Sequence, residues 1–210
     1  MQQKLKGKFV VIDGPDGCGK TTQVTLLAKW ARERSIDTVS FRDPGTTPIG
    51  ERIRQILLDP SNTAMCIRTE LLLYMAARAQ LLSEQIEPSL KAGRFVILDR
   101  WLSSTCAYQG FAGEFGERNV LDVAEHTLQR IWPDLTFILD VDLNTSKGRL
   151  KDNRDRMEQK SLAYCQKVRQ GFLNFAGNRD NVVIVEAKAA IQDVHATIIR
   201  ELTRRICNVD

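Results

Sequence analysis

The stretch "GPDGCGKTT" at residues 14–22 carries residue types and a spacing that bind phosphate. It fits the pattern G-x-x-x-x-G-K-[ST] and directly follows the apolar run "FVVID". Glycines let backbone N–H groups turn onto phosphate oxygens, and the following helix adds its positive N-terminal end. Lys20 would neutralise the β- and γ-phosphates of a nucleotide, and the Thr21 hydroxyl would ligate Mg²⁺. The alternative is a glycine-rich turn that binds nothing, and the strand-loop-helix context argues against it.

A second polar pair ends another apolar run, in "VILDRW". An Asp at the end of a buried strand is the usual second Mg²⁺ partner of a phosphate-binding loop, directly or through water, which makes Asp99 the candidate. Its neighbour Arg100 would point into the same crevice. The alternative for both is an ordinary surface charge pair.

Two more arginines have ambiguous surroundings. Arg42 lies in "FRDPGTT", where Pro44 and Gly45 favour a turn, and a lone Arg in a turn is as easily solvated as functional. Arg78 interrupts the apolar helix "LLLYMAARAQLL" four residues after Tyr74, and therefore on the same face. Either it snorkels to the surface or it lines a polar cleft beside an aromatic ring, and the spacing alone favours snorkelling.

Alternating strands and helices must position these groups. Apolar runs predict buried strands at 8–13, 94–99, 135–141 and 181–187, with a weaker fifth at 37–41. Helical stretches are predicted at about 20–34, 49–58, 68–91, 103–108, 119–130, 143–151, 159–176 and 190–206. This order predicts an α/β fold of the P-loop NTPase type, with three layers and a five-stranded parallel sheet covered by helices on both faces. Every motif falls at the carboxyl end of a strand, where such sheets bind ligands.

Composition limits the other possibilities. The chain has 210 residues, 43% of them hydrophobic, and shows no linker or repeat, so we expect one compact domain over 1–210. A net charge of +4 from 30 basic and 26 acidic residues does not argue for a nucleic-acid partner. Five cysteines without C-x-x-C pairs favour reduced thiols in a cytoplasmic protein, and no apolar run approaches the roughly 18 residues of a membrane span. The only histidines, His126 and His195, fall in helical stretches and suggest no Ser-His-Asp site.

Five motifs, "GPDGCGKTT", "FRDPGTT", "YMAAR", "DRWLSSTCAYQG" and "DRME", resemble the thymidylate kinase family, in order over nearly the whole chain. The arrangement DR-x(3)-S-T-x-A-Y-Q is the most specific of them. The resemblance implies a nucleoside monophosphate kinase architecture and a reaction in which ATP, with Mg²⁺, phosphorylates dTMP to dTDP. It also implies a homodimer, for which the long helix at 68–91, apolar on more than one face, would suit the interface.

Two alternatives to this reaction stay open. One is another kinase of the same fold, acting on dUMP, CMP or a deoxynucleoside. The other is a non-catalytic nucleotide-binding regulatory protein, although intact Lys20, Thr21, Asp99 and Arg100 argue against it.

The resemblance also implies roles at the substrate site. Asp16 would approach the 3′-hydroxyl of dTMP, and Arg42 and Arg100 would clamp its 5′-phosphate. Tyr74 would stack on thymine, where most relatives carry Phe, and Arg78 would bond the O4 carbonyl.

On the same reading, Thr105 would meet the N3 edge of the base with Ser104 supporting it. Tyr108 would lie under the sugar and resist a 2′-hydroxyl, with Gln109 beside it. Asp43 and Thr46 depart from the family, because many bacterial relatives have Glu and Gly at these positions.

The resemblance places ATP on the phosphate loop and beside the last strand. The loop residues are Gly14, Pro15, Asp16, Gly17, Cys18, Gly19, Lys20, Thr21 and Thr22. Backbone near Ala187 would border the adenine.

The basic stretch "KGRLKDNRDRME" at 147–158 would by itself be a solvated helix end. In the resembling family this segment is the lid, where Arg149 would pack against adenine and later arginines would close over the phosphates. We expect Arg156 to pair with Asp155 or Glu158. Some thymidylate kinases carry an Arg directly after the loop Asp; this chain has Gly17 there, so the missing catalytic cation must come from elsewhere. Arg154 is the first choice.

Replacing Arg154 with Ala should lower kcat by roughly 10² with little change in dTMP binding, because a lid cation meets the transferring group only on closure. Steady-state kinetics would measure this, with Arg156→Ala beside it. Near-normal kcat in both variants would leave Arg42 and Arg100 to carry the transition-state charge alone.

Overall fold

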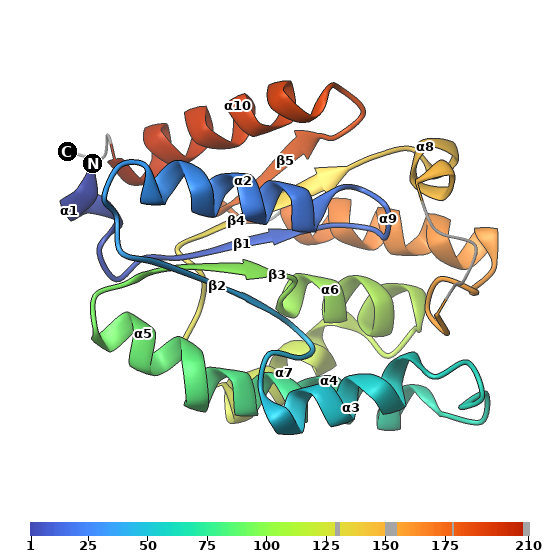
Figure 1. Cartoon of the computed structure of the whole chain (residues 1–210). Helices are drawn as coiled ribbons and strands as arrows, with labels where there is room; N and C mark the ends of the chain where they lie inside the picture. Colours follow the sequence, from blue (N-terminus) through green and yellow to red (C-terminus); the bar gives the residue numbers. More distant parts are fainter. Residues whose placement is uncertain (129–130, 150–154, 178, 208–210) are drawn as a thin grey trace.

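The structure, a computed structural model, describes residues 1–128, 131–149, 155–177 and 179–207. Its centre is a sheet of five parallel strands in the order β2-β3-β1-β4-β5 (Figure 1). The strands are β1 (Phe9–Asp13), β2 (Thr38–Arg42), β3 (Phe95–Asp99), β4 (Leu135–Asp140) and β5 (Val182–Glu186). The predicted five-stranded parallel sheet is confirmed, with each predicted strand end within one residue of the observed one.

Apart from α1, which the sequence did not predict, the helices follow the predicted order with shifts at their ends; the predicted ends at 130 and 151 lie outside the described residues. They are α1 (Gln2–Leu5), α2 (Lys20–Arg32), α3 (Pro48–Leu58), α4 (Ile67–Leu81), α5 (Glu87–Lys91), α6 (Leu102–Thr105), α7 (Glu117–Thr127), α8 (Leu143–Gly148), α9 (Leu162–Gly177) and α10 (Ile191–Leu202). Three π-helical segments continue helices: Leu82–Ile86, Cys106–Ala112 and Thr203–Cys207. No helix in the described part of the chain is long and apolar enough to cross a membrane.

The helix predicted as continuous over 68–91 changes its hydrogen bonding in the middle. A π-helical segment, Leu82–Ile86, joins α4 to α5. Pro88 follows directly in the first turn of α5 and has no N–H to donate to the preceding turn. The missing N–H of Pro88 is the physical reason why the hydrogen-bonding pattern changes here, and the π-helical turn accommodates one extra residue.

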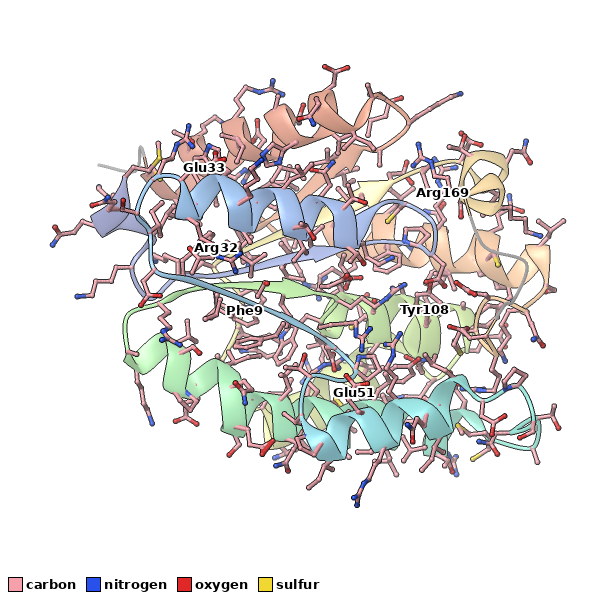
Figure 2. All side chains as sticks on the ribbon, in the orientation of Figure 1. Phe9, Arg32, Glu33, Glu51, Tyr108 and Arg169 are labelled. Atoms are coloured by element: carbon pink, nitrogen blue, oxygen red, sulfur yellow. The ribbon has the colours of Figure 1, made fainter. Side chains whose placement is uncertain are left out.

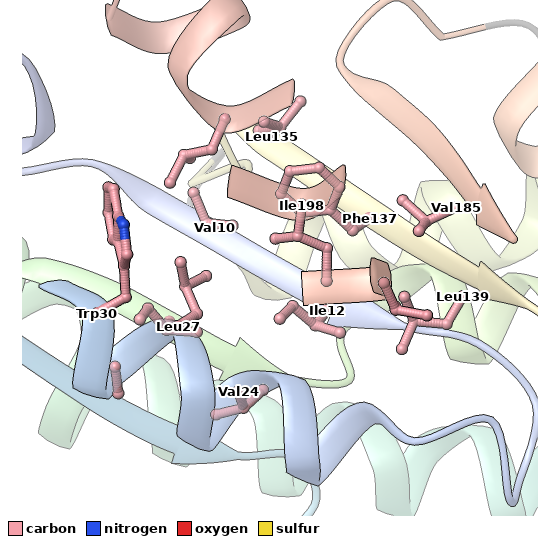
Figure 3. Close-up of a cluster of buried hydrophobic side chains, with 14 of the residues drawn as sticks. Val10, Ile12, Val24, Leu27, Trp30, Leu135, Phe137, Leu139, Val185 and Ile198 are labelled. Carbon is pink, nitrogen blue, oxygen red and sulfur yellow. The ribbon is translucent and has the colours of Figure 1, made fainter. Parts of the chain in front are cut away.

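Helices cover both faces of the sheet, as predicted (Figure 1). Successive residues of a strand point to opposite faces, so Val10 and Ile12 of β1 pack in a cluster with Leu27 of α2 and Ile198 of α10 (Figure 3). Phe9 belongs to a second cluster, on the face covered by α4 and α7. Because every side chain of β1 is buried, an uninterrupted apolar run is what the sheet requires at this strand.

The register of the strands brings three polar residues to one edge of the sheet. Asp99 at the end of β3 pairs with Ile12 of β1 on one side and with Arg42 of β2 on the other. Asp43 donates its backbone N–H to the carbonyl of Asp99 at 3.0 Å. The phosphate loop, the turn after β2 and the helix α6 therefore all leave the sheet at its carboxyl edge, beyond the arrowheads in Figure 1.

Candidate active site

A cleft of about 860 Å³ lies at this edge, a volume suited to small-molecule ligands. Most of the residues predicted to bind nucleotides line it: Asp16, Gly17, Gly19, Lys20, Thr21, Thr22, Arg42, Tyr74, Asp99, Arg100, Ser104, Thr105, Tyr108, Gln109 and Arg149. Five predicted residues that the structure describes do not line it: Gly14, Pro15, Cys18, Arg78 and Ala187. Residues scattered over the sequence from 16 to 149 thus form one site.

The phosphate loop presents its lysine and threonine at the start of α2. The Lys20 ammonium is buried and donates to the carbonyls of Gly14 at 3.1 Å and Pro15 at 2.7 Å. The Thr21 hydroxyl donates to the Asp99 carboxylate at 2.6 Å. The predicted Mg²⁺ pair is therefore brought together on the cleft wall.

These two oxygen groups fit Mg²⁺. The ion is bound through one or two protein oxygens and completes its octahedron with water and substrate phosphates. Among the described residues no group of three or more His, Cys, Asp or Glu side chains forms a cage for a metal. The donor set suits a cation that arrives with a nucleotide.

Asp13, which the sequence reasoning missed, anchors the start of the loop. Its buried Oδ1 accepts hydrogen bonds from Gly14 N at 2.8 Å and Ser104 Oγ at 2.7 Å. Its Oδ2 accepts from Ser103 Oγ at 2.5 Å, Ser104 N at 2.9 Å and Trp101 N at 3.2 Å. Ser104, predicted to support Thr105, is itself held by Asp13, and its role toward a bound base stays a prediction. The signal in the sequence was an Asp that ends an apolar strand immediately before the loop.

Arg100, Asp16 and Tyr108 form a charged cluster at the centre of the cleft. Arg100 has a left-handed backbone, with φ of 70°. Its Nη1 donates to Gly14 O at 3.1 Å and Ser104 Oγ at 3.0 Å, and its Nη2 pairs with the Asp16 carboxylate. The Tyr108 hydroxyl donates to the other Asp16 oxygen at 2.8 Å.

Arg100 and Asp16 each keep the other ionised. Burial alone would raise the pKa of Asp16, but the positive charges of Arg100 and Lys20 outweigh it, so the pKa of Asp16 is lowered. Burial opposes the charge of Arg100, yet Asp16 and the neighbouring acidic groups raise the pKa of Arg100. Burial, together with the charge of Asp16, raises the pKa of Tyr108. The cleft therefore presents a fixed cation, a fixed anion and a neutral phenol.

Arg78 does not snorkel, and that interpretation was wrong. The guanidinium is 1% exposed, with Nε donating to Asp43 Oδ2 at 2.7 Å. Its Nη2 donates to the Thr105 hydroxyl at 3.0 Å and the Trp101 carbonyl at 3.2 Å. A buried carboxylate removes the need to reach water, although burial raises the pKa of Asp43 and Arg78 opposes this. Arg78 reaches the cleft only through Thr105, and Tyr74 lines the cleft directly.

The predicted pairing of Arg156 was also wrong. Its Nη2 lies 2.6 Å from Glu70 Oε2, and its Nε donates to the carbonyl of Leu57 at 2.7 Å. Gln109 Nε2 donates to the other oxygen of Glu70 at 2.7 Å. Arg156 is buried and contacts Leu57 of α3 and Glu70 of α4. Its expected role in an ion pair is therefore kept, but the partner is Glu70 and not Asp155 or Glu158.

Helix α8 and the residue after it, Arg149, lie beside the phosphate loop and the end of β5. Arg149 Nη1 donates to the carbonyl of Ala187 at 3.1 Å, so the two residues predicted to border adenine lie together. Ser146 donates its hydroxyl to the carbonyl of Asp16 at 2.6 Å. A side chain at Gly17 would place its Cβ 2.3 Å from Ser146 O. Arg154 lies outside the described residues.

Six further residues line the cleft that were not among the predicted binding or catalytic residues: Pro44, Arg54, Leu58, Asp155, Met157 and Glu158. Arg54 of α3 donates to the carbonyl of Pro44 at 3.0 Å. Burial and the neighbouring charge of Arg42 lower the pKa of Arg54. Burial raises the pKa of Glu158. Arg54 follows Glu51 by three residues on one helix face, and that spacing was the available signal.

Comparisons with known proteins agree with one another. The thymidylate kinase family model matches residues 12–198. The thymidylate kinase of Geobacillus sp. (strain WCH70) is 38% identical over 207 residues, covering 96% of this chain and 99% of that protein. That of Latilactobacillus sakei is 42% identical over 196 residues, covering 90% and 92%. The crystal structure of thymidylate kinase from Ehrlichia chaffeensis superposes with a TM-score of 0.76 at 28% identity, covering 94% of this chain and 99% of that one.

Replacing Asp13 with Ala should reduce the free energy of unfolding by on the order of 3 kcal/mol or more, because several buried donors lose their acceptor at once. Urea unfolding would measure the change. The matched control is Asp37→Ala, whose carboxylate is exposed and pairs with Arg94 at 3.3 Å; it should cost less than about 0.5 kcal/mol. A loss below about 1 kcal/mol for Asp13→Ala would show that the carboxylate is not an anchor.

Proposed function

The chain belongs to the thymidylate kinase family, and we propose that the cleft at the carboxyl edge of its sheet is where the γ-phosphoryl group of ATP passes to dTMP. The protein is a nucleoside monophosphate kinase that uses ATP as phosphate donor. One observation carries the assignment of the site: the phosphate loop with Lys20 and the arginines Arg42 and Arg100 line the same cleft. Such a cleft can hold a donor phosphate and an acceptor phosphate against each other.

On the donor side, the phosphate loop binds the β- and γ-phosphates of ATP, with Lys20 supplying charge. Thr21 and Asp99 would hold Mg²⁺, which would supply positive charge against the negative charge of the phosphates. The Arg149 guanidinium is held at the carbonyl of Ala187, which supports a place for adenine beside the end of β5.

On the acceptor side, Arg100 and Arg42 bind the 5′-phosphate of dTMP. Asp16 remains ionised and accepts from the 3′-hydroxyl, and Tyr108, bonded to Asp16, lies under C2′ of the sugar. A ring in that place excludes a ribose by collision with the 2′-hydroxyl.

The base is read at the inner end of the cleft. Tyr74 stacks on thymine, and Thr105, which accepts from Arg78, meets its polar edge. Gln109 lies beside them with its amide nitrogen committed to Glu70, which leaves the amide oxygen as its free acceptor. Arg78 does not line the cleft, so it acts on the base only through the Thr105 hydroxyl to which it donates.

Phosphoryl transfer requires little covalent chemistry from the protein. It requires two phosphates in line, with cations around the transferring group and water excluded. We propose that the chain does this as one kinase domain, 1–210, with residues 147–158 as a lid and Arg154 as the added cation. The five free thiols support the predicted cytoplasmic location, and the absence of nucleic-acid partners stays a prediction from the net charge.

A homodimer is supported by exposed apolar side chains on neighbouring helices. Ile49 and Ile56 of α3 are 50% and 46% exposed, and Leu72 of α4 is 59% exposed. A spacing of seven places Ile49 and Ile56 on one face of α3, and such patches mark protein interfaces.

Sedimentation velocity at micromolar concentration should give about twice the 23.8 kDa of one chain. Leu72→Glu should shift the protein to monomer by burying a charge at the interface. Ile191→Glu, at an equally exposed position on α10, should leave the dimer intact. A wild-type monomer would refute the interface.

A coupled ADP-release assay over dTMP, dUMP, CMP and thymidine tests the proposed function. dTMP should be the preferred acceptor, and Lys20→Ala should lower its turnover on the order of a hundredfold or more, because the variant loses a phosphate clamp. Lys29→Ala, on the exposed face of α2, is the matched control and should keep wild-type activity. Preference for another acceptor, or a Lys20→Ala variant within about threefold of wild type, would contradict the proposal.

A further inference from the structure

Thr46 adopts a backbone conformation that its side chain disfavours. Its φ is 70°, in the left-handed region, where a β-branched residue is strained. It follows Gly45, with φ of 134°, in the turn after β2. A glycine at position 46 would adopt this conformation without strain. The chain therefore keeps a threonine where its own backbone favours glycine, which calls for a compensating role of the side chain.

The Thr46 side chain closes the turn onto Arg42. Its Oγ1 accepts from Arg42 N at 3.0 Å and donates to Arg42 O at 3.1 Å. The backbone N–H of Thr46 donates to Glu51 Oε1 at 2.7 Å. The same oxygen accepts from Arg42 Nη2 at 2.9 Å. Thr46 holds the main chain of Arg42, and Glu51, labelled in Figure 2, holds its guanidinium.

The charges of Glu51 and Arg42 favour a single position of the Arg42 guanidinium. The backbone N–H of Thr46, with a further contribution from Arg42, lowers the pKa of Glu51, so its carboxylate is charged at neutral pH. Arg42 lines the cleft, yet its side chain is 48% exposed and would otherwise sample many rotamers. Among the described residues the guanidinium donates only to Glu51, through Nη2, which leaves Nε and Nη1 for a phosphate.

We propose that Thr46 is a positioning residue for dTMP: its hydroxyl, with Glu51, holds Arg42 ready to receive the 5′-phosphate. This rests on the proposed role of Arg42 as a phosphate clamp. Ordering a long side chain before the substrate arrives removes that entropy cost from binding, and the gain appears in the affinity for the monophosphate. Within the described part of the chain the hydroxyl bonds to the main chain of Arg42 and not to the phosphate loop, so we expect ATP binding to be unaffected.

Three substitutions at position 46 separate the effect of the hydroxyl from the effect of the backbone strain. Thr46→Val keeps the shape and the strained backbone but loses both hydrogen bonds of the hydroxyl to the main chain of Arg42, and it should raise the KM for dTMP by about fivefold or more. The KM for ATP and kcat should stay within about twofold. Thr46→Ser restores the hydroxyl and should restore the wild-type KM. Thr46→Gly should raise the KM for dTMP as valine does, while its melting temperature is not lowered, because the strain is relieved.

Arg42→Ala is the reference variant. An unchanged KM for dTMP in Arg42→Ala would refute the proposed clamp itself. A raised KM in Arg42→Ala, with normal values in Thr46→Val and Thr46→Gly, would refute the positioning role alone. Lowered melting temperatures with parallel changes in both KM values, not restored by serine, would make Thr46 merely structural. In an Arg42→Ala background Thr46→Val should have no further effect on the KM for dTMP, as a coupled pair requires.

Discussion

The buried carboxylate of Asp13 joins the two segments on which the catalytic cleft depends. It accepts from the first residue of the phosphate loop and from the start of α6, segments about ninety residues apart in the chain. A carboxylate this deep in the protein is costly unless its lone pairs are filled, and here they are. The same carboxylate therefore joins the loop to the start of α6.

The positions of Arg100, Thr105 and Arg78 depend on these two segments. Arg100 lies between the two anchored segments, and its left-handed backbone turns the chain so that the guanidinium faces the loop while Trp101 N faces Asp13. Thr105, in the next turn, holds Arg78, and Arg78 in turn holds Asp43 at the base of the Arg42 turn. A chain of charge-assisted bonds thus runs from β1 to the edge strand β2. Such bonds are directional, which keeps the phosphate-binding arginines in register with the loop.

The features predicted from the sequence are those with a local signal. The five strands are short apolar runs with turn residues at their ends, and Lys20 and Thr21 follow from a motif whose spacing is set by phosphate geometry. The features missed depend on partners far apart in the chain. Arg78 was misread because helix periodicity shows its face but not the buried Asp43, 35 residues earlier, that neutralises it. Arg156 was misread for the same reason, since its partner Glu70 lies on α4, far from it in the chain.

The contact between Gly17 and α8 restricts the evolutionary routes open to this protein. A Cβ at position 17 would meet the main-chain oxygen of Ser146 at 2.3 Å, and φ at Gly17 is 74°. Because the obstacle is a carbonyl, no exchange of side chain at position 146 removes it. An arginine at position 17 thus requires the backbone of α8 or of the phosphate loop to shift, so the residue at position 17 and the position of α8 are coupled.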